Sequence, residues 1–190
     1  MSPDPSKIGE IGAALTAVHE ESVAYWRSFK TPTFLAPIGA AWSPSQNVRH
    51  LTKAMRAVTR ALQMPRFAVL LLFGPVRHAG RSYAEMRELY QARLARGADA
   101  GPYSPGAASP SADPAAERTR VMESHATAVQ ELVRAAMRWS EPALDVRQLP
   151  HPLLGKLTVR EMLFFTLYHS RHHLDVVKRR IASTERPAGA

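Results

Sequence analysis

Three helix-start signals of the same kind limit what this chain can fold into. Serine or threonine is followed three residues later by glutamine or glutamate at Ser43–Gln46, Ser82–Glu85 and Thr158–Glu161. In such a capping box the two side chains satisfy backbone amides that the first helical turn leaves unpaired. Apolar residues at three- and four-residue steps follow, which is the period of an amphipathic helix. The chain is therefore expected to be built from helices.

Five helical stretches are predicted. The first covers about residues 5–29, with Asp4 as N-cap and Pro5 at the first helical position. The other four cover about residues 44–65, 82–97, 114–139 and 158–183. No segment shows the sustained two-residue alternation with β-branched residues that is typical of a strand. The sequence predicts an all-α protein, a four-helix bundle with an additional short helix.

The stretch between the third and fourth predicted helices has a different composition. Residues 97–116 are rich in Gly, Pro, Ala and Ser, and we expect a long, flexible surface loop there. This loop is not interpreted as a domain linker, because neither side alone contains a complete fold. We also expect a flexible tail at residues 184–190. The whole chain, residues 1–190, is predicted to be a single bundle domain.

The chain contains no cysteine, which excludes disulfides, thiolate metal sites and cysteine nucleophiles. A transition-metal site would therefore have to use histidine and carboxylate ligands. The N-terminal residues lack the layout of a signal peptide. The longest apolar run, residues 67–73, is far shorter than the roughly 20 residues that span a bilayer. We expect a soluble, cytoplasmic protein without a membrane partner.

The net charge is +9, from 25 Lys and Arg against 16 Asp and Glu. Such a balance can indicate a nucleic-acid partner. The basic residues are spread along the chain, however, and no run is longer than Lys178-Arg179-Arg180. No predicted helix interleaves arginines with aromatic residues along one face. We interpret the charge as a generally basic surface, which argues against nucleic-acid binding.

His169 and His173 carry the first indication of chemistry. They are four residues apart in the last predicted helix, so they lie about one turn apart on one face, at about 1.5 Å of rise per residue. The same face carries Met162, Phe165 and Val176. Imidazoles within an apolar stripe need partners, because an unpaired buried polar group costs a few kcal/mol. A shared divalent ion would satisfy both rings.

His50 strengthens the metal hypothesis. It lies in the second predicted helix, two turns after the capping box. If the second and last helices are neighbours, His50 can complete a set of three nitrogens. Three protein ligands leave open positions for water or substrate, as in catalytic sites.

The remaining five histidines are weaker candidates. His172 points about 100° away from His173 around the helix, so we expect it in solvent or supporting the ligands. His151 precedes a proline just before the last helix and could border the mouth of the site. His19, His78 and His125 stand alone, and we interpret them as surface or structural residues.

Three segments carry a resemblance to a known family. They are Trp42–Leu51, which contains His50; His151–Thr158, a His-Pro-x-x-Gly turn; and Met162–Leu174, which contains the H-x-x-x-H pair. In this order they resemble the DinB/YfiT-like superfamily of metal-dependent enzymes, over about residues 42–181. The resemblance implies a four-helix bundle with His50, His169 and His173 as ligands of zinc or nickel. Characterised members include S-transferases and isomerases that use low-molecular-weight bacterial thiols, and some members are described as hydrolases.

Two classes of function follow. The first is a divalent-metal-dependent enzyme, either a thiol-dependent S-transferase or a hydrolase, that acts on a small molecule. The sequence does not choose between them and names no catalytic residue beyond the ligands, because Glu161 serves its cap and no other carboxylate has ligand spacing. The second class is a non-enzymatic helical module that binds nucleic acid or a protein, with a vestigial or structural metal site. A homodimer is compatible with both.

Overall fold

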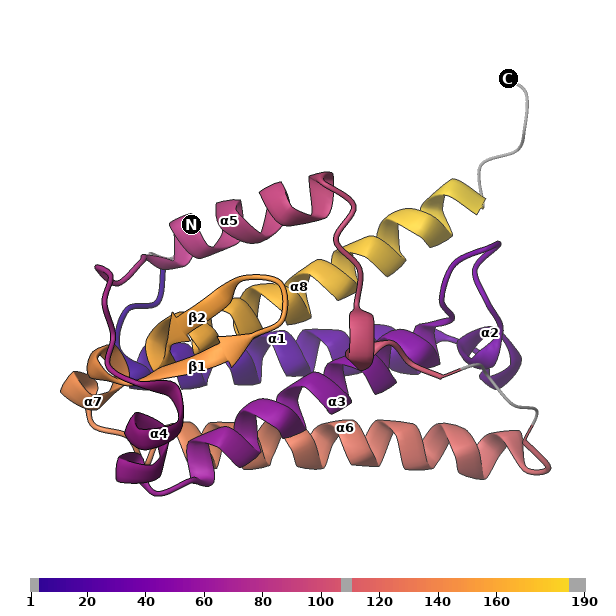
Figure 1. Cartoon of the computed structure of the whole chain (residues 1–190). Helices are drawn as coiled ribbons and strands as arrows, with labels where there is room; N and C mark the ends of the chain where they lie inside the picture. Colours follow the sequence, from indigo (N-terminus) through magenta and orange to yellow (C-terminus); the bar gives the residue numbers. More distant parts are fainter. Residues whose placement is uncertain (1–3, 107–110, 185–190) are drawn as a thin grey trace.

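The computed structural model describes residues 4–106 and 111–184, and within them the chain forms eight α-helices, one 3₁₀-helix and two short strands. Figure 1 shows their arrangement. The elements in chain order are α1 (Ile8–Ser28), α2 (Thr31–Leu35), α3 (Pro44–Gln63), α4 (Arg66–Phe73), α5 (Tyr83–Ala95), η1 (Gly101–Tyr103), α6 (Pro114–Ala136), α7 (Glu141–Val146), β1 (Gln148–His151), β2 (Gly155–Thr158) and α8 (Val159–Thr184).

The four longest helices, α1, α3, α6 and α8, form the predicted four-helix bundle. Helix α3 packs against α6 and α8, and α1 packs against the same two helices, so the four make a closed ring (Figure 1). Their apolar faces meet in the core, where Ile11, Leu132, Leu163 and Leu174 are fully buried. Helices α3 and α8 are thus neighbours, as the three-histidine hypothesis requires. Helix α5 packs against the α8 side of the bundle.

The predicted helix starts are largely confirmed. Complete capping boxes form at Ser43 and Ser82, and at Thr158 the hydroxyl accepts from the Glu161 amide while the Glu161 carboxylate accepts from the Thr158 amide. Asp113 caps α6. The first helix differs from the prediction, because it begins at Ile8 and not at Pro5. The reason is the Glu10 carboxylate, which accepts the backbone amides of residues 6 and 7 and so fixes the first turn there.

A small hairpin is the main element that the sequence did not predict. Strands β1 and β2 pair antiparallel, with Leu149 opposite Leu157 and His151 opposite Gly155. Each strand has four residues, which is too short for a convincing alternation. Gly155 closes the turn with φ +76°, a conformation that favours glycine. The short helices α2, α4 and α7 also go beyond the single extra helix expected.

The segment after α5, expected to be a surface loop, is attached to the bundle where the structure describes it. The Lys53 ammonium on α3 donates to the Pro102 carbonyl at 2.6 Å, within η1. Residues 107–110 of the predicted loop and 185–190 of the predicted tail lie outside the described residues. None of the helices in the described part of the chain is long and apolar enough to cross a membrane.

Candidate metal centre

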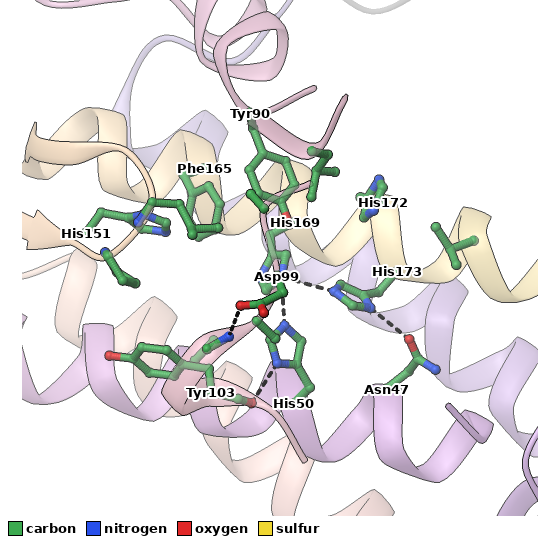
Figure 2. Close-up of a pocket in the computed structure, with 18 of the residues that line it drawn as sticks. Asn47, His50, Tyr90, Asp99, Tyr103, His151, Phe165, His169, His172 and His173 are labelled. Carbon is green, nitrogen blue, oxygen red and sulfur yellow. Dashed lines mark hydrogen bonds between the residues drawn. The ribbon is translucent and has the colours of Figure 1, made fainter. Parts of the chain in front are cut away.

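Three histidines from two helices converge at the wall between α3 and α8 (Figure 2). His169 and His173 project from successive turns of α8, and His50 faces them from α3. The Nε2 atom of His169 lies 2.9 Å from Nε2 of His50 and 3.1 Å from Nε2 of His173. All three side chains are buried, with 4%, 5% and 9% exposure for His50, His169 and His173. The structure therefore brings together the three histidines that the sequence proposed as metal ligands.

In two of these histidines, a hydrogen bond at Nδ1 determines which ring nitrogen carries the hydrogen. His50 Nδ1 lies 2.8 Å from the Tyr103 carbonyl oxygen, which can only accept, so Nδ1 carries the hydrogen. His173 Nδ1 lies 2.8 Å from Asn47 Oδ1. The Asn47 amide nitrogen is used in donating to the Ser43 carbonyl at 2.9 Å, so its oxygen faces the histidine as an acceptor. In both neutral rings the Nε2 lone pair thus points toward the centre of the cluster.

These convergent lone pairs provide a test of whether the residues fit a metal ion. If His169 carried a hydrogen on Nε2, it could donate to only one of its two neighbours, and the other lone pair would stay unpaired. One cation would satisfy all three nitrogens. Two nitrogens at about 2.0–2.1 Å from a tetrahedral ion lie roughly 3.3 Å apart, close to the spacings of 2.9 and 3.1 Å found here. The donor set and its geometry fit a divalent transition metal.

The electrostatic environment keeps the three rings neutral, which is the form that binds metals. Burial, reinforced by the neighbouring His173 and His50, holds the pKa of His169 well below its ordinary value. Burial, reinforced by His50, has the same effect on the pKa of His173. Burial also lowers the pKa of His50, and this outweighs the hydrogen bond to Tyr103, which raises it.

Aromatic side chains hold the imidazole rings in place. Trp42 stacks on His173 with an angle of 6° between the rings, and Phe165 stacks on His169 with an angle of 21°. Tyr90 of α5 meets His169 edge to face. These contacts limit the rotation of the His169 and His173 rings, so their nitrogens are oriented before any ion binds.

The cluster opens into a pocket of about 920 Å³ between α3, α8, α5, the hairpin and η1. Its walls are mainly apolar, and they include Val58, Leu94, Leu149 and Val176. Asp99, just before η1, is the single carboxylate on the wall among the described residues (Figure 2). Its Oδ1 accepts the Gly101 amide at 2.8 Å, which orients the side chain. The pocket can hold a small, largely apolar molecule beside the three nitrogens.

The remaining histidines take different positions. His172 lies outside the three-nitrogen group, as its angle on the helix predicted. It lines the pocket, which was not predicted, and packs against Tyr90 and Tyr168. His151 also lines the pocket. The three isolated histidines have structural contacts: His125 bonds Thr52, His19 packs on His125, and His78 contacts Lys156.

Sequence reasoning missed three residues that support or face the cluster. Asn47 lies one helical turn before His50, and this i, i+3 spacing was an available signal. Tyr103 supplies only its backbone carbonyl, so its residue type gave no signal. Asp99 lies in the Gly- and Pro-rich segment, whose composition says nothing about the direction of a side chain.

Comparison with known proteins gives one finding. The family model described as the DinB superfamily matches residues 14–177, which include α3, the hairpin and the histidines of α8. No curated protein and no solved structure gives a significant match to the chain.

Proposed function

Since the chain belongs to the DinB superfamily, we propose that it is a divalent-metal-dependent enzyme in which His50, His169 and His173 hold the ion. The observation that supports this proposal is the convergence of three imidazole nitrogens, all within 4.8 Å of one another, at the wall of an apolar pocket. Zinc and nickel suit an all-imidazole set. A bound divalent ion would supply Lewis acidity and lower the pKa of a thiol or water next to it.

The protein residues around the ion have definable tasks. Asn47 and the Tyr103 carbonyl hold His173 and His50 with their Nε2 lone pairs toward the ion. The apolar walls exclude water and so strengthen electrostatic interactions inside the pocket. Three protein ligands leave a coordination position free toward the substrate.

The reaction that we propose first is transfer of a low-molecular-weight thiol to a small electrophile. The three-imidazole set with a free position can accept a thiolate, and the largely apolar pocket suits a small organic electrophile. Hydrolysis is the second candidate, and Asp99 is the observation that favours it. As the carboxylate on the pocket wall, Asp99 could take a proton from an attacking water.

Cobalt substitution tests this proposal. Untagged protein should retain close to one equivalent of divalent metal after gel filtration, and the cobalt form should develop a charge-transfer band when a thiol is added. Less than about a tenth of an equivalent after zinc or nickel reconstitution would refute the metal site, since a site of this type binds tightly.

The Asp99→Asn variant then separates the two reactions. It should keep thiol binding in the cobalt form. If the protein hydrolyses ester or amide substrates instead, this variant should lose that activity by about a hundredfold or more, as expected for a general base.

The binding-module hypothesis is tested on the same material. Metal that is present without thiol binding or turnover would favour it. Nucleic-acid affinity that falls steeply as salt increases would identify the basic surface as the functional one.

A further inference from the structure

His151 differs from the three clustered histidines in how its ring is held. It is the last residue of β1, and its Nδ1 atom lies 3.1 Å from the Leu153 amide and 3.2 Å from the Leu154 amide. Both amides are donors, so Nδ1 acts as the acceptor and carries no hydrogen. The neutral ring must therefore carry its hydrogen on Nε2. This tautomer is the opposite of the one that His50 and His173 adopt.

The Nε2–H group of His151 is left free for a ligand. The ring lines the pocket and packs edge to face on Phe165, with 4.2 Å between ring centroids (Figure 2). Phe165 in turn stacks on His169, so His151 lies one ring away from the candidate metal ligands. Nε2 makes no hydrogen bond to any residue that the structure describes. A free donor thus projects from an otherwise apolar part of the wall.

The charge state of this donor also follows from its surroundings. Burial lowers the pKa of His151 to about 4, so the ring is neutral near pH 7. A neutral N–H donor suits an uncharged oxygen acceptor, whereas a protonated ring would select an anion.

We propose that His151 is a substrate-binding residue that donates a hydrogen bond from Nε2 to a carbonyl oxygen of the substrate. The substrate class is then a small, mainly apolar molecule with a carbonyl group on the side of the pocket formed by the hairpin and Phe165. In a carbonyl electrophile this donor would also stabilise negative charge that develops on the oxygen. This role of His151 rests on the proposed function. The tautomer of the ring and its free N–H group, however, are the same with or without a bound metal ion.

Two substitutions separate the two roles of the His151 ring, which are to accept the turn amides at Nδ1 and to donate into the pocket from Nε2. In His151→Asn the amide oxygen can take the place of Nδ1 and accept the turn amides, but the pocket donor is lost. In His151→Gln the amide NH₂ can take the place of Nε2 and keep the pocket donor, while the acceptor for the turn is lost. The two variants should therefore fail in opposite ways, the first in ligand binding and the second in stability.

The probe is cyclohexanone, with methylenecyclohexane as the control that has the same shape but no oxygen acceptor. Binding is followed by NMR of ¹⁵N-histidine-labelled protein as purified, with the metal content assayed in parallel.

In wild-type protein His151 should appear as the Nε2–H tautomer at pH 7, and cyclohexanone should shift its N–H resonance. His151→Asn should bind cyclohexanone about five- to tenfold more weakly, the loss expected for one hydrogen bond, and His151→Gln should bind it within about threefold of wild type. Methylenecyclohexane should bind all three proteins equally.

Several results would overturn the assignment. They are an Nδ1–H tautomer or a protonated ring at pH 7, no response of His151 to cyclohexanone, and unchanged affinity in His151→Asn. Loss of the metal site would appear separately in the metal assay, so failure of the proposed function and failure of this inference are distinguishable.

Discussion

At the scale of single residues, hydrogen bonds at the Nδ1 atoms of two of the three histidines orient them for metal binding. An isolated imidazole can place its hydrogen on either nitrogen, and only one form leaves Nε2 free for a metal. The Tyr103 carbonyl selects that form for His50, and Asn47 selects it for His173. The opposite choice at His151 comes from two backbone amides. The chemical roles of these histidines thus depend on their partners as much as on their positions.

The first prediction at this scale concerns the ligands themselves. Changing His50, His169 or His173 to alanine should each abolish tight metal binding, because two remaining imidazoles cannot hold the ion alone. His172→Ala is the matched control, since it removes a neighbouring pocket histidine outside the group. Equilibrium dialysis with zinc measures the stoichiometry of each variant. Loss of metal in His172→Ala with retention in His173→Ala would mean that the wrong face of α8 has been assigned.

The second prediction concerns the supporting amide. Asn47→Ala should weaken zinc binding by about 10- to 100-fold, because His173 loses the acceptor that fixes its tautomer. Asn47→Asp keeps an acceptor and should lose less. Thr59→Ala is the control on the same helix, because the buried Thr59 hydroxyl donates to the Met55 carbonyl and Thr59 does not belong to the histidine cluster. Competition with a zinc-binding dye gives the affinities. Equal affinity in the Asn47 and Thr59 alanine variants would remove Asn47 from the site.

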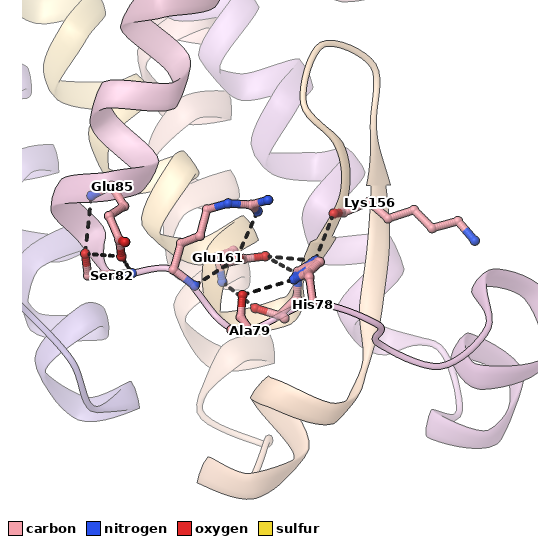
Figure 3. A network of polar contacts seen from close by, with 8 residues as sticks. His78, Ala79, Ser82, Glu85, Lys156 and Glu161 are labelled. Atoms are coloured by element: carbon pink, nitrogen blue, oxygen red, sulfur yellow. Dashed lines mark hydrogen bonds and ion pairs between the residues drawn. The ribbon is translucent and has the colours of Figure 1, made fainter.

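At the scale of elements, Glu161 links the start of α8 to the segment before α5 (Figure 3). Its fully buried carboxylate accepts from the Thr158 amide at 2.7 Å. It also accepts from the Arg81 amide at 2.9 Å and from the Arg81 guanidinium at 3.1 Å. His78 packs beside the same carboxylate and contacts the Lys156 carbonyl in β2. The capping residue predicted from local sequence therefore also joins elements that are far apart in the chain.

The third prediction measures this link. Glu161→Ala should lower the free energy of unfolding by about 3 kcal/mol, because it leaves buried donors without an acceptor. Glu85→Ala removes the equivalent acidic residue from the exposed capping box of α5 and should cause a smaller loss. Urea unfolding followed by circular dichroism compares the two variants. Equal losses would show that Glu161 acts only as a helix cap.

At the scale of the whole molecule, the bundle buries several imidazoles, among them His50, His125, His169 and His173. Burial lowers the pKa of His125 to about 3 and that of His151 to about 4. The pKa values of His50, His169 and His173 are lowered as well. In the unfolded chain these groups regain ordinary pKa values of about 6.5. The folded protein thus binds fewer protons than the unfolded chain in mildly acidic solution.

The fourth prediction follows from this difference. Stability of the metal-free protein should be greatest above about pH 6.5 and fall as the pH drops toward about 4, because protons then favour the unfolded chain. His125 and His151, whose pKa values in the folded protein are about 3 and about 4, each contribute a slope of about 1.4 kcal/mol per pH unit within that window. In His125→Leu, the free energy of unfolding should change with pH less steeply, by about 1.4 kcal/mol per pH unit. Urea unfolding at several pH values checks this, and a flat profile between pH 7 and 4 would contradict it.

Features that depend on neighbouring residues in the chain could be predicted from the sequence. The capping boxes at Ser43, Ser82 and Thr158 form because their partners are three residues apart. Helical geometry likewise determines that His169 and His173 share a face while His172 leaves it. The all-α bundle and the proposed three-histidine set follow from these local patterns together with the family resemblance. The predicted start of α1 is three residues early, because the Glu10 carboxylate accepts the backbone amides of residues 6 and 7 and the helix begins at Ile8.

Features that join distant parts of the chain were decided only by the tertiary structure. The pairing of His50 with His169 spans 119 residues, and the bond from His50 to the Tyr103 carbonyl spans 53. Backbone carbonyls and amides are present at every residue, so no residue type indicates which of them will support a histidine. Asp99 and His151 face the pocket because η1 and the hairpin are packed against the bundle. The sequence therefore determined the helices and the candidate ligands, while packing determined their tautomers and the residues that complete the pocket.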